Sequence, residues 1–159
     1  MKQLTKPVYK IKNIEENTID MVRPATSRVT SSQICVAYLR EKWEPRTMQS
    51  HESVYALYLN SKAEVIFFVK INKGSYMQTT FDLREVMQYA FNIHSDYIIV
   101  AHNHPCGKPD PSQADIELTK KIAEAFSMVD LFLLDHIVLT EREYFSFKDA
   151  GILPKGGYN

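Results

Sequence analysis

The run of apolar residues from Tyr97 to Ala101 ends in two histidines and a proline, in the sequence YIIVAHNHP. A short, continuous apolar run of this kind predicts a strand that is buried on both faces of a sheet. Proline cannot donate to the hydrogen-bond ladder, so Pro105 ends the strand directly after the histidines. Ligands of open α/β sheets usually bind at the carboxyl ends of strands. The sequence therefore predicts a functional site around His102 and His104.

Strand patterns and helix patterns alternate along the rest of the chain. Helical spacing of apolar residues covers residues 31–43, 81–94 and 112–129. Strand patterns cover residues 54–59, 64–71, 96–104, 131–140 and 142–147. A turn at residues 60–62 joins the first two strands as a hairpin, and Ser31 or Ser32 is the expected N-cap of the first helix. These patterns predict the α/β class, with a mixed central sheet flanked by helices. No G-x-G-x-x-G follows a strand, which argues against a doubly wound dinucleotide fold.

The composition fits one domain and gives no general sign of a charged partner. The 159 residues are 45% hydrophobic, and 19 Lys and Arg balance 19 Asp and Glu. This balance gives no overall attraction to nucleic acid or to an anionic membrane. No run is apolar enough to span a membrane and no signal peptide is visible, so a cytoplasmic location is expected. Two cysteines, Cys35 and Cys106, are too few for a disulfide framework.

The two histidines and a later aspartate have the chemistry of a zinc site. His102 and His104 are two residues apart on a strand, so their side chains point to one face, about 6–7 Å apart. A proline-rich loop then leads into a helix whose first turn carries Asp115, and this carboxylate can reach back to the same metal. Catalytic zinc usually keeps three protein ligands and leaves the fourth position to water, whose pKa falls to about 7. Ser112 is close enough in sequence to donate a hydrogen bond to a developing oxyanion.

The spacing of these residues resembles the metal motif of the JAMM/MPN-domain metallopeptidases: His-x-His, seven residues, Ser112, two residues, Asp115. The segments IIVAHNHPCGKPDPSQADIELTKKI, LLDHIVL, YFSFKDAGIL, HESVYALYLN and LREVMQYAF resemble the RadC branch of that family more closely. The resemblance covers roughly residues 31–153. It implies a cytidine-deaminase-like mixed sheet, a bound Zn²⁺ and hydrolysis of an amide or isopeptide bond in a peptide substrate. It also implies that Glu52 matches the family's upstream glutamate, which holds the nucleophilic water, acts as general base and then protonates the leaving amine.

The chain departs from the RadC pattern in two places. The RadC branch commonly has serine where this chain has Cys106, a position that is not a motif ligand. Many RadC proteins also carry an N-terminal helix-hairpin-helix DNA-binding region, for which the residues before this domain are too few. We expect an N-terminal arm at residues 1–28, a metal-binding domain at residues 29–153 and a flexible tail at residues 154–159. The second departure weakens a DNA-repair role, and the exposed arm could support a homodimer.

The metal residues also have simpler structural interpretations. A lone His-x-His is more often structural, and only the Ser and Asp at the family's spacing favour a metal. Ser112 and Asp115 form a variant of the helix capping box, a role that is compatible with metal binding because it fixes where Asp115 points. Asn103, between the histidines, is expected to face away from them and to fix the neighbouring loop.

The remaining candidates are less specific. Glu44, Glu64 and Glu85 compete with Glu52 for the role of base, although Glu85 fits better in the first turns of a helix, where carboxylates complement the dipole. His136 lies in a buried strand, where a core histidine is the favoured interpretation and a place beside the ligands is the alternative.

Three functions follow from these patterns. The first is a zinc-dependent metallohydrolase of the peptidase or isopeptidase type. The second is a RadC-type module of DNA repair or mobile elements, whose metal site is structural or vestigial, although the neutral charge argues against direct DNA binding. The third, a zinc nucleobase deaminase, needs H-x-E and P-C-x-x-C, and His104 stands where that glutamate would be.

Overall fold

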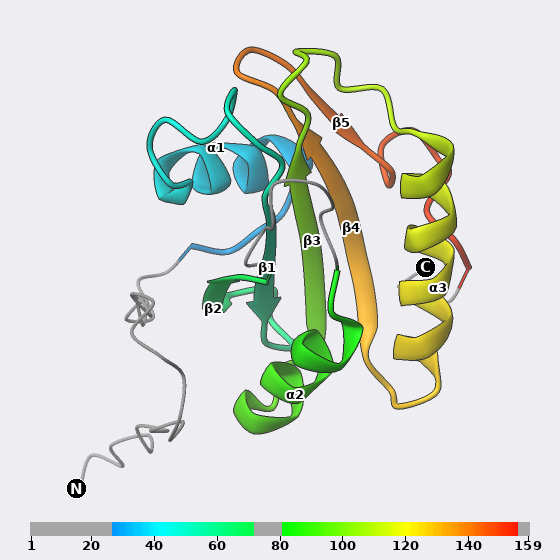
Figure 1. Cartoon of the computed structure of the whole chain (residues 1–159). Coiled ribbons are helices and arrows are strands. Elements are labelled where there is room, and N and C mark those ends of the chain that lie inside the picture. The colour runs from blue at the N-terminus through cyan, green and yellow to red at the C-terminus, as the bar shows by residue number, and fades with distance from the viewer. Residues whose placement is uncertain (1–26, 72–80, 156–159) are drawn as a thin grey trace, which may run out of the picture.

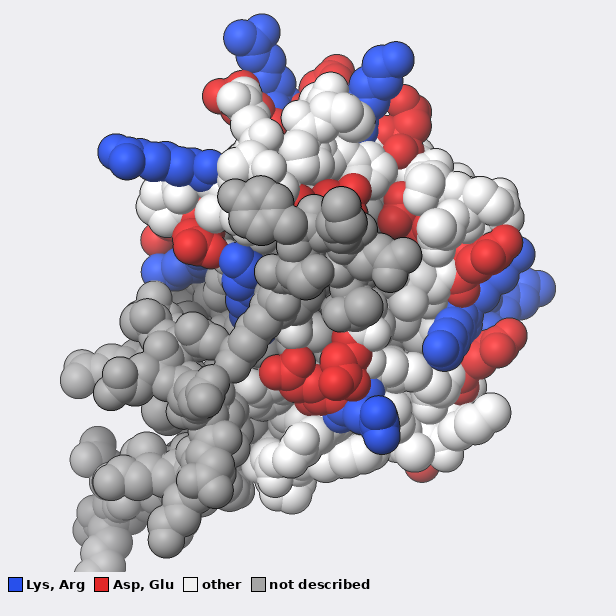
Figure 2. All heavy atoms as spheres, in the orientation of Figure 1, with Lys and Arg blue, Asp and Glu red and all other residues white. Residues whose placement is uncertain are grey.

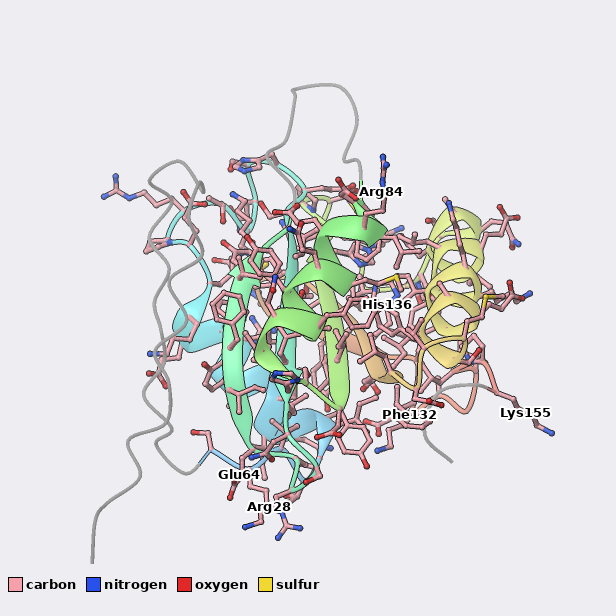
Figure 3. All side chains as sticks on the ribbon, turned by 90° about the horizontal axis from the view of Figure 1, so that it is seen from below. Arg28, Glu64, Arg84, Phe132, His136 and Lys155 are labelled. Carbon is pink, nitrogen blue, oxygen red and sulfur yellow. The ribbon has the colours of Figure 1, made fainter. Side chains whose placement is uncertain are left out.

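A computed structural model of the chain describes residues 27–71 and 81–155 (Figure 1). Most of the predicted arm and the tail beyond Lys155 lie outside the described residues. Ser27 and Arg28, the last residues of that arm, join the domain. The backbone N–H of Val65 donates to the carbonyl of Ser27 over 3.2 Å, and Arg28 forms an isolated antiparallel bridge with Glu64, the two residues labelled together in Figure 3.

A five-stranded mixed sheet forms the centre of the fold, in the order β2-β1-β3-β4-β5. Only β3 and β4 run parallel, and the other three neighbouring pairs are antiparallel. The strands are β1 (Val54–Leu59), β2 (Val65–Lys70), β3 (Tyr97–Asn103), β4 (Phe132–Leu139) and β5 (Tyr144–Ser146). The central strand β3, which carries the histidine motif, is therefore held by a neighbour on each side.

In residues 27–71 and 81–155, three helices cover the two faces of this sheet, and α1 and α3 lie on opposite sides of it (Figure 1). They are α1 (Ser32–Lys42), α2 (Leu83–Ile93) and α3 (Gln113–Ser127). Each begins at a side-chain cap, in which Ser31, Asp82 and Ser112 accept hydrogen bonds from backbone N–H groups of the first turn. Within the described ranges, no helix combines the length and the apolar character that crossing a membrane would require.

The apolar faces of the helices divide the core into two layers. Residues of α1, including Cys35 and Leu39, pack on one face of the sheet against Leu57 and Ile99. Residues of α2 and α3 pack on the other face, and their largest fully buried side chain, Phe126, belongs to α3. Because β1, β3 and β4 are covered on both faces, their sequences lack the regular alternation of apolar and polar residues that a half-exposed strand shows.

A β-bulge in β4 decides which of its residues face α3. Ile98 of β3 pairs with Leu133, but the next residue, Ile99, pairs with Asp135, so one residue of β4 is extra. After the bulge, the side chains of β4 exchange faces. Asp135 therefore points to the α1 side, and His136 points to the side of α3, where His102 also lies.

The predicted fold class is confirmed, and so are the hairpin, the three helices and the returning strand β5. Ser31, not Ser32, is the N-cap of α1. The helix ends at Lys42, before Pro45, as that proline predicts. Strand and helix bounds differ from the predicted ranges by only one or two residues at most ends.

Asp135 is a buried carboxylate that fastens the segment after β5. It accepts hydrogen bonds from the Ser146 hydroxyl over 2.5 Å and from the backbone N–H groups of Lys148 and His136 over 3.0 and 2.7 Å. Burial raises the pKa of the Asp135 carboxyl from its ordinary value of 3.8 to about 6, and the hydrogen bonds limit that rise.

Asp135→Asn should flatten the pH dependence of stability between about pH 4 and pH 6. The folded state holds this proton more tightly than the unfolded chain does, so the free energy of unfolding falls as pH rises through that window, by on the order of 3 kcal/mol. The asparagine amide stays neutral, its oxygen can accept from the same N–H groups, and its nitrogen can donate to Ser146. Urea unfolding at a series of pH values measures the slope. Asp110→Asn, in an exposed loop, should keep the wild-type slope, and a wild-type slope in Asp135→Asn would contradict this assignment.

Candidate metal centre

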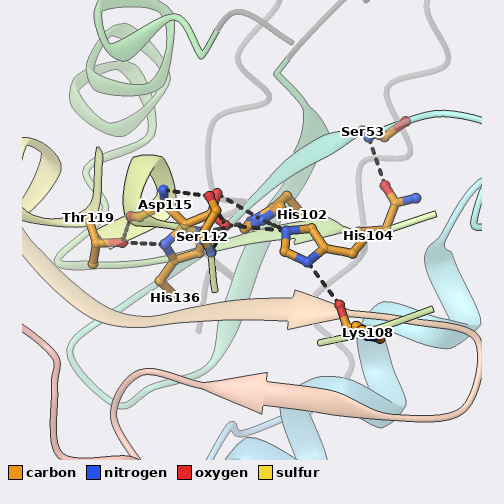
Figure 4. Close-up of polar contacts among 9 residues, drawn as sticks. Ser53, His102, His104, Lys108, Ser112, Asp115, Thr119 and His136 are labelled. Atoms are coloured by element: carbon orange, nitrogen blue, oxygen red, sulfur yellow. Dashed lines mark hydrogen bonds and ion pairs between the residues drawn. The ribbon is translucent and has the colours of Figure 1, made fainter. Parts of the chain in front are cut away.

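Three predicted side chains converge at the carboxyl end of β3: His102, His104 and Asp115. Each offers one potential ligand atom, and these atoms all lie within 4.8 Å of one another. The Nε2 atoms of the two histidines are 3.0 Å apart. The Asp115 carboxylate oxygens lie 3.2 Å from Nε2 of His102 and 3.3 Å from Nε2 of His104. The convergence that the sequence predicts is therefore present, and Figure 4 shows it in close-up.

Each of these residues is placed by a different element. His102 is the sixth residue of β3 and is fixed on both sides, by Val54 of β1 and Val138 of β4. His104 follows the strand, and its backbone N–H donates to the carbonyl of Leu139 over 2.8 Å, which extends the pairing with β4 by one residue. Asp115 comes from the first turn of α3, so the sheet and the helix meet at the cluster.

The predicted capping box of α3 is confirmed, and it orients the Asp115 carboxylate. The backbone N–H and the hydroxyl of Ser112 both donate to Asp115 Oδ2 over 2.7 Å, and Ser112 Oγ accepts from the Asp115 backbone N–H over 3.1 Å. Burial alone would raise the pKa of the Asp115 carboxyl, but hydrogen bonding and charge at His102, together with the bonds from Ser112, lower it well below its ordinary value. Asp115 therefore presents a charged, fixed carboxylate to the cluster.

The spacing of the donor atoms suits a tetrahedral metal ion. Zinc bonds to nitrogen and oxygen are about 2.0–2.1 Å long, so two ligands of a tetrahedral zinc are about 3.3 Å apart. In the cluster the two Nε2 atoms are 3.0 Å apart, Asp115 Oδ1 is 3.2 Å from His102 Nε2, and Asp115 Oδ2 is 3.3 Å from His104 Nε2. Two imidazoles and one carboxylate also form a ligand set that leaves a fourth position for water. The residues present therefore fit a zinc ion.

The ring nitrogens of the histidines that face away from the cluster are also hydrogen-bonded. His104 Nδ1 lies 3.0 Å from the carbonyl oxygen of Lys108 in the following loop. His102 Nδ1 lies 2.8 Å from Nε2 of His136, and Nδ1 of His136 lies 2.6 Å from the hydroxyl of Thr119 on α3. His136 is a buried core histidine, as the sequence favours, and it also touches a candidate ligand. Its complete burial and the neighbouring His102 lower its pKa well below the ordinary value.

Asn103, between the two histidines, points to the opposite face and holds the segment that precedes β1. Its amide nitrogen donates to the carbonyls of Met48 and His51 over 2.8 and 3.0 Å, and its Oδ1 accepts from the backbone N–H of Ser53 over 2.7 Å. The last of these bonds is drawn to Ser53 in Figure 4. The prediction that Asn103 faces away from the histidines is confirmed, and the segment that it fixes is the one before β1, which carries Glu52.

Glu52 is exposed and lies just before β1, outside the group of ligand atoms. Two residues later, Val54 is paired with His102, and the Asn103 N–H donates to the carbonyl of Ser53 over 3.3 Å. The backbone therefore brings Glu52 to the same end of the sheet as the cluster, although the structure does not bring its carboxylate into it.

The competing glutamates have other surroundings. Glu44 forms an ion pair with Lys70 at 2.8 Å. Glu64 accepts a hydrogen bond of 2.8 Å from the Asn60 amide, and Glu85 lies in the first turn of α2.

A pocket of about 480 Å³ opens beside His104, between the loop after β3, the segment before β1 and the turn that joins β4 to β5. It is lined by Met48, Gln49, His104, Pro105, Gly107, Thr140, Glu141, Arg142 and Glu143. Arg40 of α1 fixes the turn, because its guanidinium donates to the carbonyls of Thr140, Glu141 and Glu143 over 2.9, 2.7 and 3.1 Å. A ligand therefore has room beside His104, next to the β4–β5 turn that Arg40 holds in place.

A mixed α/β sheet with a His-x-His strand end and a helix-borne aspartate is consistent with a domain of the JAB/MPN type. The family model described as the RadC-like JAB domain matches residues 29–152, and the chain belongs to this family.

Three similar proteins carry the same family label, UPF0758. A UPF0758 protein of Neisseria meningitidis serogroup B is 39% identical over 99 residues, which are 62% of this chain and 44% of that protein. A UPF0758 protein of Coxiella burnetii is 44% identical over 108 residues, which are 67% of this chain and 48% of that protein. A third, from Flavobacterium johnsoniae, is 40% identical over 102 residues. The matched region is thus less than half of the first two relatives.

Asn103→Ala should loosen the segment that carries Glu52. The substitution leaves two backbone carbonyls and one N–H without their partner, at a cost of about 1–3 kcal/mol for a buried group. We expect the free energy of unfolding to fall by roughly that amount and the amide of Ser53 to exchange its hydrogen faster, both measurable by denaturation and hydrogen exchange. Gln49→Ala, which removes an exposed amide from the same segment, should leave the Ser53 amide protected. Equal protection of Ser53 in Asn103→Ala and wild type would show that Asn103 does not hold the segment.

Proposed function

We propose that this chain is a zinc-dependent hydrolase that cleaves amide bonds of the peptide or isopeptide type. The observation that carries the proposal is the convergence at the end of β3, where the two Nε2 atoms are 3.0 Å apart and each lies 3.2–3.3 Å from one of the two Asp115 carboxylate oxygens; this ligand set fits a zinc ion with a free fourth position. His102, His104 and Asp115 hold the metal in this proposal. When bound there, zinc supplies Lewis-acid chemistry, which polarises a carbonyl oxygen and acidifies a water molecule.

Glu52 is the general base of the proposed reaction. It takes a proton from the attacking water and later gives a proton to the leaving amine, roles that one carboxylate can perform in turn. Its position supports this role, since the paired residues Val54 and His102 bring its backbone to the same sheet end as the cluster. Asn103 helps by fixing the segment before β1.

Ser112 has two roles in the proposal. Its hydroxyl and its backbone N–H hold Asp115, and the hydroxyl can also turn to donate to the oxygen that gains negative charge as the amide is attacked. The pocket beside His104 gives the substrate chain a place to lie.

The charges on one face of the molecule give no support to DNA binding there. Figure 2 shows Lys and Arg side chains interspersed with Asp and Glu side chains over one face of the molecule. A protein that binds DNA through its backbone phosphates needs Lys and Arg gathered in a patch or stripe. The net charge of zero agrees with this interpretation.

Purified protein should contain about one zinc ion per chain, measured by elemental analysis. His104→Ala removes one of three ligands and should lose most of this zinc. His51→Ala removes an exposed histidine that is outside the cluster and should keep it. A wild-type protein that contains no divalent metal, and that cannot be loaded with one, would contradict the proposal.

Glu52→Gln should retain zinc but lose hydrolysis of amide-linked or isopeptide-linked substrates by about 10²–10⁴-fold, the usual contribution of a general base. The assay is a screen of peptide and isopeptide substrates with the zinc-loaded protein, with chelation as a second control. Glu44→Gln removes a carboxylate that pairs with Lys70 and should leave the rate unchanged. Zinc-loaded protein that cleaves none of these substrates, but binds DNA in a salt-dependent way even as Glu52→Ala, would favour the non-catalytic RadC-type module.

A further inference from the structure

Three hydrogen bonds link one candidate ligand to the backbone of another through the interior of the domain. They run from His102 Nδ1 to His136 Nε2 over 2.8 Å, from His136 Nδ1 to Thr119 Oγ1 over 2.6 Å, and from Thr119 Oγ1 to the Asp115 carbonyl over 2.5 Å. The bonds to Thr119 and His136 are drawn in Figure 4, and Figure 3 places His136 inside the fold beside α3. We name this chain of bonds the His136–Thr119 relay.

The direction of the relay follows from its last member. A carbonyl oxygen can only accept, so the single hydroxyl hydrogen of Thr119 points to Asp115 O. The Thr119 oxygen must then accept from an N–H at Nδ1 of His136. A neutral imidazole has one N–H, so Nε2 of His136 is an acceptor, and His102 must donate to it through Nδ1.

The surroundings of His136 support the neutral ring that this argument needs. The ring is 1% exposed and stacks on Phe147 with centroids 4.8 Å apart and an angle of 12° between the planes. Within the described part of the chain, its hydrogen bonds go to His102 and Thr119, and neither partner is a carboxylate. Burial of a ring that has no hydrogen bond to a carboxylate disfavours a charged imidazole.

With its proton on Nδ1, His102 presents the lone pair of Nε2 to the cluster. His104 reaches the same state in a simpler way, since the carbonyl of Lys108 requires a donor at Nδ1 of His104. Both Nε2 atoms can then bind one cation. The proton carried by the outer nitrogen decides which nitrogen of a histidine can bind a metal.

We propose that His136 and Thr119 are positioning residues that hold His102 in the tautomer whose Nε2 can bind a metal. The inference rests on the metal site of the proposed function, but it concerns a property of His102 that exists before any metal binds. It gives His136 and Thr119, which are both buried, a role in metal binding that does not require them to touch the metal or the substrate.

The first experiment measures the tautomer of His102 by ¹⁵N NMR of zinc-free protein at about pH 8, above the usual range in which imidazole is protonated. The wild type should carry its proton on Nδ1. Thr119→Val, which keeps the shape of the side chain and removes the hydroxyl, should give a mixture of tautomers. Thr47→Val makes the same change at a buried threonine whose hydroxyl donates to Glu44 O, and it should leave His102 unchanged. A wild-type His102 with its proton on Nε2, or an unchanged tautomer in Thr119→Val, overturns the inference.

The second experiment measures zinc affinity by competition with a chelator. Loss of an outer partner of a metal-bound histidine typically weakens binding about 10–100-fold, and we expect this loss in Thr119→Val and in His136→Phe but not in Thr47→Val. His136→Gln should recover much of the affinity, because its amide oxygen can accept from His102 while its nitrogen donates to Thr119.

Wild-type zinc affinity in Thr119→Val overturns the inference. A wild-type protein that binds no zinc overturns the proposed function instead, and the tautomer measurement then decides whether the His136–Thr119 relay exists.

Discussion

The two imidazole nitrogens of His102 and His104 lie 3.0 Å apart, with the Asp115 carboxylate 3.2–3.3 Å from both. Two lone pairs at this distance repel each other, and a cation bound by all three groups would remove that repulsion. The local fold nevertheless holds all three in place. A strand fixed on both sides supplies His102, and a capping box at the start of α3 aims Asp115. These elements therefore bring three potential ligands of one cation together at the end of β3.

In the tripeptide His102-Asn103-His104, successive side chains point to opposite faces of the sheet, as in any strand. The histidines turn to the α3 side, where the helix brings Asp115. Asn103 turns to the other side and holds the segment that carries Glu52 through three hydrogen bonds. One strand end therefore positions the proposed metal ligands and the proposed base together, which is what a hydrolytic site requires.

Much of this structure could be predicted from the sequence because local patterns determine it. Caps, turns and apolar spacing predict the helices and the hairpin, and Pro105 predicts where β3 ends. The part that could not be predicted depends on pairing between distant segments. His136 faces the cluster only because a bulge in β4 reverses the side-chain alternation between Leu133 and Asp135, and no local residue pattern in that apolar run marks the bulge. Thr119 likewise belongs to the apolar stripe of its helix in the sequence, and only the fold shows that its hydroxyl lies next to His136.

The placement of Glu52 has a similar origin. Its selection among several glutamates comes from the resemblance of the surrounding segment to RadC proteins, and composition or spacing alone does not distinguish it. The pairing of β1 with β3 then gives a physical reason, because it carries the start of β1 to the cluster. Glu44 and Glu64 have partners of their own, which a sequence read without its fold does not reveal.

The central claim is that His102, His104 and Asp115 bind one zinc ion directly, and X-ray absorption at the zinc edge of the loaded protein tests it most directly. The account predicts a first shell of four light atoms at about 2.0–2.2 Å, with the outer-shell scattering of two imidazole rings. Sulfur in the first shell, or no imidazole scattering, would place the metal elsewhere and contradict the account.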